Sequence, residues 1–184
     1  MGVNAIAREA KADKVLVYRY FGGLAGLLKA YARSSDFWPS AEELAPEKAT
    51  DPATLASGTL SRLVQALRSR PATQEILAWE LVEASPLAER TADIRERSGL
   101  EAMAKLSGGT PPEVDLPAVA AILTAGLTYL VLRARTAPAW LGVSLKDEDG
   151  WGRVESAVDT VVRAIFAGGE PRSPAPRSSQ VRNR

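Results

Sequence analysis

The sequence predicts an all-α protein, and three observations support this prediction. Residues that favour helices, such as Ala, Leu, Glu and Arg, dominate the chain, apolar residues recur at helical spacing, and Pro or Gly clusters separate segments of helix length. The 184 residues can form one domain, or a small domain attached to a larger one. An apolar fraction of 46% and a charged fraction of 24% are ordinary for a soluble globular protein with a buried core.

Two helices are expected on either side of an aromatic run near the N-terminus. Residues 2–11 and 24–38 each place apolar side chains on one stripe at helical spacing. Pro39 ends the second of these segments. The polar, Pro-containing stretch that follows predicts a linker or an irregular crossing over residues 39–51.

Further helices are expected in the rest of the chain. Residues 52–69 carry Leu and Val at helical spacing, and residues 71–85 begin with Pro at a plausible first helical position and end before another Pro. A charged helix is expected over roughly 86–106, before the breaker SGGTPP. An apolar helix then covers about 115–136, and the last helix, about 148–167, has a regular apolar stripe.

The run KVLVYRYF, residues 14–21, has the β-branched and aromatic residues of a strand. As a strand it would have no polar face and no partner in a helical protein. As a helix it begins after Asp13, an N-cap residue, and ends at Gly22, which suits a C′ position. Val17 and Phe21 then pair at i,i+4 toward a core, so we predict a short helix.

This short helix follows the first one after a turn of a few residues, which is helix-turn-helix spacing. Eight residues are about 12 Å long as a helix, and the major groove of DNA is about 12 Å wide. The spacing alone is weak evidence for DNA binding, because helical cores also show it by chance.

The absence of two residue types limits the chemistry that the chain can perform. It contains no Cys and no His, which excludes disulfides, thiolate ligands and a Cys nucleophile and removes the usual proton shuttle near neutral pH. The stretch FGGLAG lies outside any βαβ unit, and SGGTPP lacks the Gly-Lys-Ser/Thr of a P-loop. We therefore expect no enzyme activity, no metal and no cofactor.

Charge is distributed unevenly along the chain, although the net charge is only +1. Residues 1–36 hold six basic and three acidic residues, whereas residues 37–167 hold 13 basic and 18 acidic residues. A basic head on an acidic body indicates an anionic partner for the head. After residue 167 the chain is rich in Pro, Ser and Arg, so we expect a disordered tail over residues 168–184.

One stretch could be considered as a membrane span. LPAVAAILTAGLTYLVL, residues 116–132, is 17 residues long and would reach about 25 Å as a helix. It contains Pro117 and two Thr, which favour a buried or interface helix. No signal peptide is visible either, so we expect a cytoplasmic protein that does not associate with a membrane.

The segment IAREAKADKVLVYRYFGGLAGLL, residues 6–28, resembles the signature of the tetracycline-repressor (TetR) family of transcription regulators. That signature contains Ile-Ala, then Ala-Gly-Val-Ser, then a recognition helix with Leu-Tyr-x-His-Phe, and finally two leucines. Val17 stands at the Leu position of the recognition helix. The residues that match the signature in register are Ile6, Ala7, Ala10, Tyr18, Phe21, Leu27 and Leu28.

Three positions depart from the signature. Lys11 stands where the family usually has Gly, so the turn must accommodate a Cβ there. Tyr20 replaces the usual His, and Leu24 replaces a Lys that usually contacts the DNA backbone. Family members also have another helix before this motif. The resemblance therefore implies either a start upstream of Met1 or a head truncated at its N-terminus.

The resemblance implies roles for three sets of residues. Those expected to contact the groove or the phosphates of DNA are Lys14, Val15, Leu16, Tyr18, Arg19 and Tyr20. Those expected in a four-helix homodimer interface, formed by the last two helices of each subunit, are Leu123, Leu127, Leu130, Val154, Val158 and Val161. Those expected around a cationic or planar apolar inducer are Trp79, Glu80, Glu83, Met103, Tyr129 and Trp140.

Each set also has an ordinary structural interpretation. The tyrosines could pack on neighbouring helices, the apolar set could be the core of a monomer, and Glu80 and Glu83 could be solvated or ion-paired.

The resemblance predicts an N-terminal helix-turn-helix DNA-binding head over residues 1–38, followed by a helical ligand-binding and dimerisation body over residues 52–167. Such a protein would be a ligand-responsive regulator, most simply a repressor, that binds a pseudo-palindromic operator as a homodimer and is released by a small-molecule inducer. The alternative is a helical dimeric small-molecule-binding protein whose truncated head no longer binds DNA. A membrane-associated helical protein is a further alternative.

Overall fold

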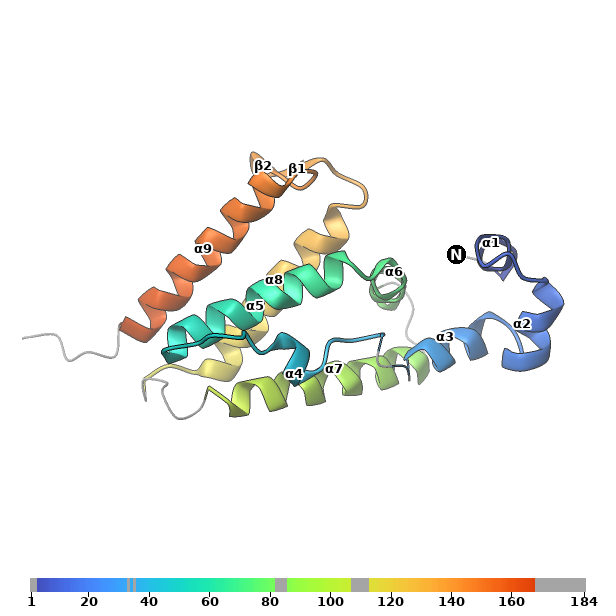
Figure 1. Cartoon of the computed structure of the whole chain (residues 1–184), viewed down its shortest axis with the longest axis horizontal. Coiled ribbons are helices and arrows are strands. Elements are labelled where there is room, and N and C mark those ends of the chain that lie inside the picture. The colour runs from blue at the N-terminus through green and yellow to red at the C-terminus, as the bar shows by residue number, and fades with distance from the viewer. Residues whose placement is uncertain (1–2, 33, 35, 82–85, 107–112, 168–184) are drawn as a thin grey trace, which may run out of the picture.

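The computed structural model describes residues 3–32, 34, 36–81, 86–106 and 113–167. Most of these residues are helical, so the protein is all-α, as its sequence predicts (Figure 1). One small antiparallel hairpin, β1 (Ala139–Trp140) with β2 (Val143–Ser144), precedes the last helix. The helices of the described residues are α1 (Val3–Glu9), α2 (Lys14–Phe21), α3 (Leu24–Ala32), α4 (Ala41–Leu44), α5 (Pro52–Arg68), α6 (Pro71–Glu80), α7 (Pro86–Ala104), α8 (Leu116–Arg133) and α9 (Glu148–Ala167).

Helix α5 is at the centre of the larger part of the molecule, which we call the body (α4 to α9). It packs against α4, α6, α8 and α9 (Figure 1). Leu60, Leu63, Val64 and Leu67 recur at the spacing of one helical face and are all buried. Trp151 of α9 lies in the same core and is also buried. The body is therefore held together mainly by apolar burial around α5.

A second, smaller core joins α3 to the body. Phe37 is fully buried, packs with Ile76 of α6, and meets the ring of Tyr31 of α3 edge to face, with centroids 6.1 Å apart. The hydroxyl groups of Tyr31 and Thr73 lie 3.2 Å apart, and the Thr73 hydroxyl donates to the carbonyl of Phe37 at 2.7 Å. The position of α3 is therefore coupled to α6.

Helices α1, α2 and α3 form a smaller unit, which we call the head, at one end of the molecule (Figure 1). Helix α2 packs against both α1 and α3, and α3 reaches the body through α7. Among the head residues whose burial the structure describes, Ala7 of α1 and Val17 of α2 are the buried residues with an apolar side chain. The head therefore has little core of its own and depends on short turns for its geometry.

The stretch 39–51 is more than the linker that its composition predicts. Helix α4 lies within it and packs against α5 and α7. Ser40 caps this helix, accepting a hydrogen bond from the backbone N–H of Glu43 at 3.2 Å. Ala41 and Leu44 are buried, so this stretch contributes to the core of the body. Two inward apolar residues within one helical turn leave no periodicity that a sequence pattern could reveal.

Several predicted helices end earlier in the structure than in the sequence analysis. Helix α3 ends at Ala32 because the chain then turns to bury Phe37, and α1 ends at Glu9 before a turn that contains Lys11. The predictions for residues 82–85, including Glu83, and for the tail, 168–184, lie outside the described residues.

The hairpin between α8 and α9 was not expected from the sequence. Leu141 and Gly142 form its turn with φ of 47° and 76°, and two consecutive positive φ angles are typical of a type I′ turn. Leu is an unusual residue for such a turn, so only Gly142 gives a signal in the sequence. The hairpin also packs tightly on α9, because a Cβ at Gly150 would lie 2.0 Å from the carbonyl oxygen of Ser144.

The turn between α1 and α2 is strained at Lys11. Its φ of 50° lies in the left-handed region, which costs a residue with a side chain about 1–2 kcal/mol. Lys11→Gly is therefore expected to stabilise the α1–α2 pair by about 1 kcal/mol, which amide hydrogen exchange in the two helices can measure. Lys29→Gly, in the right-handed interior of α3, is the matched control and should destabilise its helix by about 1 kcal/mol. Faster amide hydrogen exchange in α1 and α2 of the Lys11→Gly variant than in the wild type would show that the backbone at Lys11 is not strained.

Candidate nucleic-acid interface

Helix α2 has defined caps at both ends. The Oδ1 atom of Asp13 accepts a hydrogen bond from the backbone N–H of Val15 at 2.9 Å. At the other end, Gly22 adopts φ 70°, and its N–H donates to the carbonyl of Tyr18 at 2.9 Å. These caps begin and end the helix where the sequence predicts, at Lys14 and Phe21. The strand interpretation of this run was therefore wrong.

The outer surface of α2 contains all six residues predicted to contact DNA. Val17 is buried, which fixes the opposite side of the helix toward solvent. Phe21, predicted to pair with Val17 in the core, is 39% exposed, because its position at the end of the helix leaves it at the edge of the head. We call the exposed surface the α2 face, and it consists of Lys14, Val15, Leu16, Tyr18, Arg19 and Tyr20.

The charge around the α2 face is mainly positive. Arg8, Lys11 and Lys29 are exposed on the neighbouring parts of the head. Within the α2 face, the Arg19 guanidinium lies over the ring of Tyr20, with its carbon 5.8 Å from the ring centroid. Such a cation–π contact restricts the guanidinium while leaving its N–H groups free to donate. The surface therefore combines cationic, phenolic and aliphatic groups on one short helix.

The corner between α2 and α3 determines how α2 is presented. A Cβ built on Gly26 of α3 would lie 1.6 Å from the carbonyl oxygen of Phe21, far below any real contact. The two helices can therefore meet only because residue 26 has no side chain. Gly26 was not among the residues expected to matter, although an isolated Gly inside a helical pattern can signal a packing constraint.

The residues predicted around an inducer lie in separate places. The side chain of Glu80, at the end of α6, is nearly buried. Its Oε2 atom forms an ion pair with Nη1 of Arg95 on α7, at 2.8 Å. The Glu80 carboxylate also accepts a hydrogen bond from the hydroxyl of Thr91. Tyr129 of α8 and Trp140 of β1 instead form an edge-to-face pair with each other, with centroids 5.3 Å apart. The structural interpretation of Glu80 as ion-paired is therefore the one observed, and the predicted set does not form a single wall.

The other predicted inducer residues are only partly characterised. Trp79 is half-buried beside Glu80, and Met103 is half-buried near the end of α7. Glu83 lies outside the described residues. The Glu80–Arg95 ion pair is nevertheless connected to the head side of the body, because the Arg95 guanidinium carbon lies 5.9 Å from the ring centroid of Trp38, which adjoins the buried Phe37.

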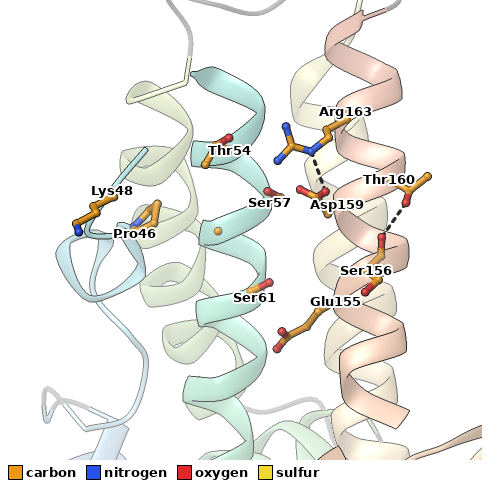
Figure 2. A pocket seen from close by; sticks show the side chains of 11 residues that line it. Pro46, Lys48, Thr54, Ser57, Ser61, Glu155, Ser156, Asp159, Thr160 and Arg163 are labelled. Atoms are coloured by element: carbon orange, nitrogen blue, oxygen red, sulfur yellow. Dashed lines mark hydrogen bonds and ion pairs between the residues drawn. The ribbon is translucent and has the colours of Figure 1, made fainter. Parts of the chain in front are cut away.

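A groove of about 580 Å³ lies between α5, α9 and the loop before α5, and Figure 2 shows its polar lining. Arg163 donates to Asp159 at 2.8 Å, and this hydrogen bond, together with one to Ser57, lowers the pKa of the Asp159 carboxyl from its usual range. The hydroxyl groups of Ser156 and Thr160 donate to backbone carbonyls of their own helix. None of the predicted inducer residues lines this groove, and these polar side chains already bond within the protein.

Most of the residues predicted to form a dimer interface lie against the core of the protomer, and the interface itself stays a prediction. Leu127 and Val158 are buried in the core of the protomer itself, and Leu123, Leu130 and Val154 are partly buried against that core. They face inward because α8 and α9 both pack on α5, so these apolar stripes contribute to the core of the protomer. Of the six predicted residues, only Val161 is exposed, at 45%.

A different surface of α8 is both apolar and exposed. Ile122 is 72% exposed and Tyr129 is 46% exposed, and Ala118, Ala121 and Ala125 are exposed on the same helix. Helix α8 has 18 residues with a mean hydropathy of 1.7, and only 11% of them are buried. By length and composition it is the one helix of the described residues that could cross a membrane. We call this surface the α8 face, and it consists of Ala118, Ala121, Ile122, Ala125 and Tyr129.

Comparison of the chain with protein-family models, with curated proteins and with solved structures finds no match. The described residues also contain no group of three or more Asp or Glu that could hold a metal ion.

Proposed function

We propose that this protein is a TetR-like, ligand-responsive transcription regulator, most simply a repressor, that binds DNA through the α2 face. The single observation that supports this proposal is the capped eight-residue helix α2, which presents basic, phenolic and aliphatic side chains outward from a positively charged head. Lys and Arg attract phosphates and Arg can bind guanine bidentately, while a tyrosine hydroxyl can donate to a phosphate oxygen. A helix of this length fits within the width of a major groove.

The proposal includes a homodimer, because a pseudo-palindromic operator presents two half-sites about 34 Å apart to two recognition helices. We place the dimer contact on the α8 face, together with the exposed Val161 of α9, rather than on the leucines and valines that line the protomer core. Small side chains such as Ala allow helices from two subunits to approach closely, and Ile122 and Tyr129 supply apolar area.

The proposal also includes a small-molecule inducer that acts near the Glu80–Arg95 ion pair. This ion pair lies between α6 and α7, and aromatic contacts connect it to α3 through Trp38, Phe37 and Tyr31. A ligand that moves Arg95 would disturb the packing that positions α3. Because α2 packs against α3, the α2 face would then move relative to the body. Binding would then shift the population toward head positions that no longer match the two half-sites.

The DNA-binding part of the proposal is tested by the double variant Tyr18→Phe with Arg19→Ala. We expect its affinity for the operator to fall roughly 10- to 100-fold, because one base-reading group and one phosphate donor are lost. Fluorescence anisotropy or a gel shift on DNA upstream of the gene measures this, and the salt dependence should also become shallower. Arg153→Ala is the matched control, since Arg153 is exposed on α9, away from the head (Figure 1).

An unchanged operator affinity and salt dependence in the double variant would contradict the assignment of the α2 face as the DNA-binding surface. A wild-type protein that is dimeric and binds small molecules but no DNA would instead support the alternative of a small-molecule-binding protein.

The inducer part of the proposal is tested with the variant Trp38→Leu. A compound that raises the melting temperature of the wild-type protein in a thermal-shift screen should also release the operator. Trp38→Leu is expected to keep the thermal shift and lose the release, because it interrupts the aromatic contacts between Arg95 and Phe37. Trp140→Leu, on the hairpin, is the control and should keep both responses. If the compound still releases the operator from the Trp38→Leu variant, the aromatic contacts through Trp38 do not transmit the effect of the inducer.

A further inference from the structure

The outermost line of α2 contains one aliphatic and one cationic residue. At 3.6 residues per turn, the buried Val17 places Val15 and Arg19 on the opposite side of the helix, where they are separated by four residues and lie one above the other. Leu16 lies beside this line, and Val15 and Leu16 are 58% and 41% exposed. Two adjacent exposed aliphatic side chains on an eight-residue helix form a small apolar patch that is complementary to apolar groups of a partner.

The charge of the head indicates which partner this is. The exposed charged side chains of the head include Arg8, Lys11, Lys14 and Lys29 against Glu9, while the carboxylate of Asp13 is engaged in capping its own helix. A cationic surface of this kind is complementary to a polyanion rather than to an ordinary protein surface. The apolar groups that duplex DNA exposes in its major groove are the C5-methyl groups of thymine.

The separation of the two residues sets a spacing on the DNA. Four residues at 1.5 Å each place Val15 and Arg19 about 6 Å apart along the helix axis. Successive base pairs are about 3.4 Å apart, so a helix lying along the groove would bring these side chains to positions about two base pairs apart. The guanidinium of Arg19 also lies over the ring of the next residue, Tyr20, with its carbon 5.8 Å from the ring centroid.

We infer that the α2 face recognises a half-site in which thymines lie about two base pairs from a guanine, with Val15 and Leu16 against the thymine methyl groups and Arg19 on O6 and N7 of the guanine. This inference rests on the proposed function and specifies the class of DNA sequence that the protein binds. Because two of the outward residues are aliphatic, methyl recognition contributes a large part of the sequence preference, and hydrogen bonding to the guanine supplies the rest.

The test begins with selection of bound duplexes from a random pool by the full-length protein. The thymines of the selected half-site are then replaced by deoxyuridine, which lacks the methyl group, and the guanine is replaced by 7-deazaguanine, which lacks N7. We expect the wild-type protein to lose roughly three- to fivefold in affinity for each methyl group removed. The double variant Val15→Ala with Leu16→Ala should bind the thymine and deoxyuridine duplexes almost equally.

Three controls make the result specific. Ala favours helices more than Val or Leu, so the double variant should keep α2 folded, which hydrogen exchange can verify. Leu100→Ala, an equally conservative change at a residue of α7 that is 51% exposed, should keep the full response to deoxyuridine. Arg19→Ala should lose the response to 7-deazaguanine and keep the response to deoxyuridine.

The outcomes separate this inference from the proposed function. If the wild-type protein binds selected DNA but ignores deoxyuridine, or if the double variant responds as the wild type does, the inference is overturned and DNA binding stands. Selected sites without a thymine and a guanine at this spacing would also overturn it. If the pool yields no bound duplex and a protein partner is captured through the α2 face instead, the proposed function is overturned as well.

Discussion

Gly26→Ala is expected to weaken operator binding roughly 10- to 100-fold while the body stays folded. The new Cβ would lie 1.6 Å from the carbonyl oxygen of Phe21, and real Cβ atoms are not found closer than 3.0 Å to such an atom. The clash is with backbone, so no side-chain rotation can relieve it. The end of α2 must therefore move by more than 1 Å relative to α3, which displaces the α2 face from the geometry that base contacts need.

Two measurements distinguish this effect from general destabilisation. The melting temperature of the body should change little, because Gly26 lies outside its core around α5, whereas operator affinity measured by anisotropy should fall. Gly99→Ala on α7 is the matched control: a Cβ at this position would have no neighbour within 4 Å, so the change should stabilise the helix by about 0.5–1 kcal/mol and leave affinity unchanged. A Gly26→Ala variant with wild-type affinity would show that the corner does not position α2 for binding.

Features specified by neighbouring residues could be predicted from the sequence. The bounds of α2 follow from Asp13 and Gly22, which act on the backbone groups next to them, and the structure confirms both caps. The start of α5 follows in the same way from Asp51, whose side chain accepts a hydrogen bond from Thr54 at 2.8 Å, followed by Pro52. Local chemistry of this kind does not depend on the rest of the fold.

Features specified by contacts between distant residues could not be predicted. Gly26 matters only because Phe21 approaches it, and Leu44 is buried only because α5 and α7 meet α4. Neither contact leaves a periodic pattern along the chain. The same limit applies to the Glu80–Arg95 ion pair, whose partners are on different helices.

Helix α8 shows why the sequence could not separate core residues from interface residues. The helix is apolar on most of its circumference, so periodicity does not indicate which side faces the protomer core. Packing on α5 buries the side with Leu127 and Val131, and Leu123 packs against the same core. The side with Ala residues, Ile122 and Tyr129 is left exposed, and this side is the one available to a second subunit.

Ile122→Glu is accordingly expected to convert the proposed dimer to a monomer. A carboxylate at the centre of the α8 face would lose its water on association without a partner charge in the described part of that face, and burying an unpaired charge is strongly unfavourable. Light scattering at micromolar concentration should then report half the wild-type mass. Leu100→Glu, at an exposed residue of α7, is the matched control and should leave the mass unchanged.

Operator binding should respond to the same substitution, because a monomer presents one α2 face and can occupy one half-site at a time. We expect Ile122→Glu to lower the affinity for the complete operator by roughly 100-fold or more and its affinity for an isolated half-site much less, since linking two binding events raises affinity by about that factor. The comparison also tests the membrane alternative for α8: a wild-type protein that needs detergent, and an Ile122→Glu variant that does not, would indicate that the α8 face meets lipid. A wild-type protein that is monomeric without detergent would contradict both the dimer contact and the membrane contact of the α8 face.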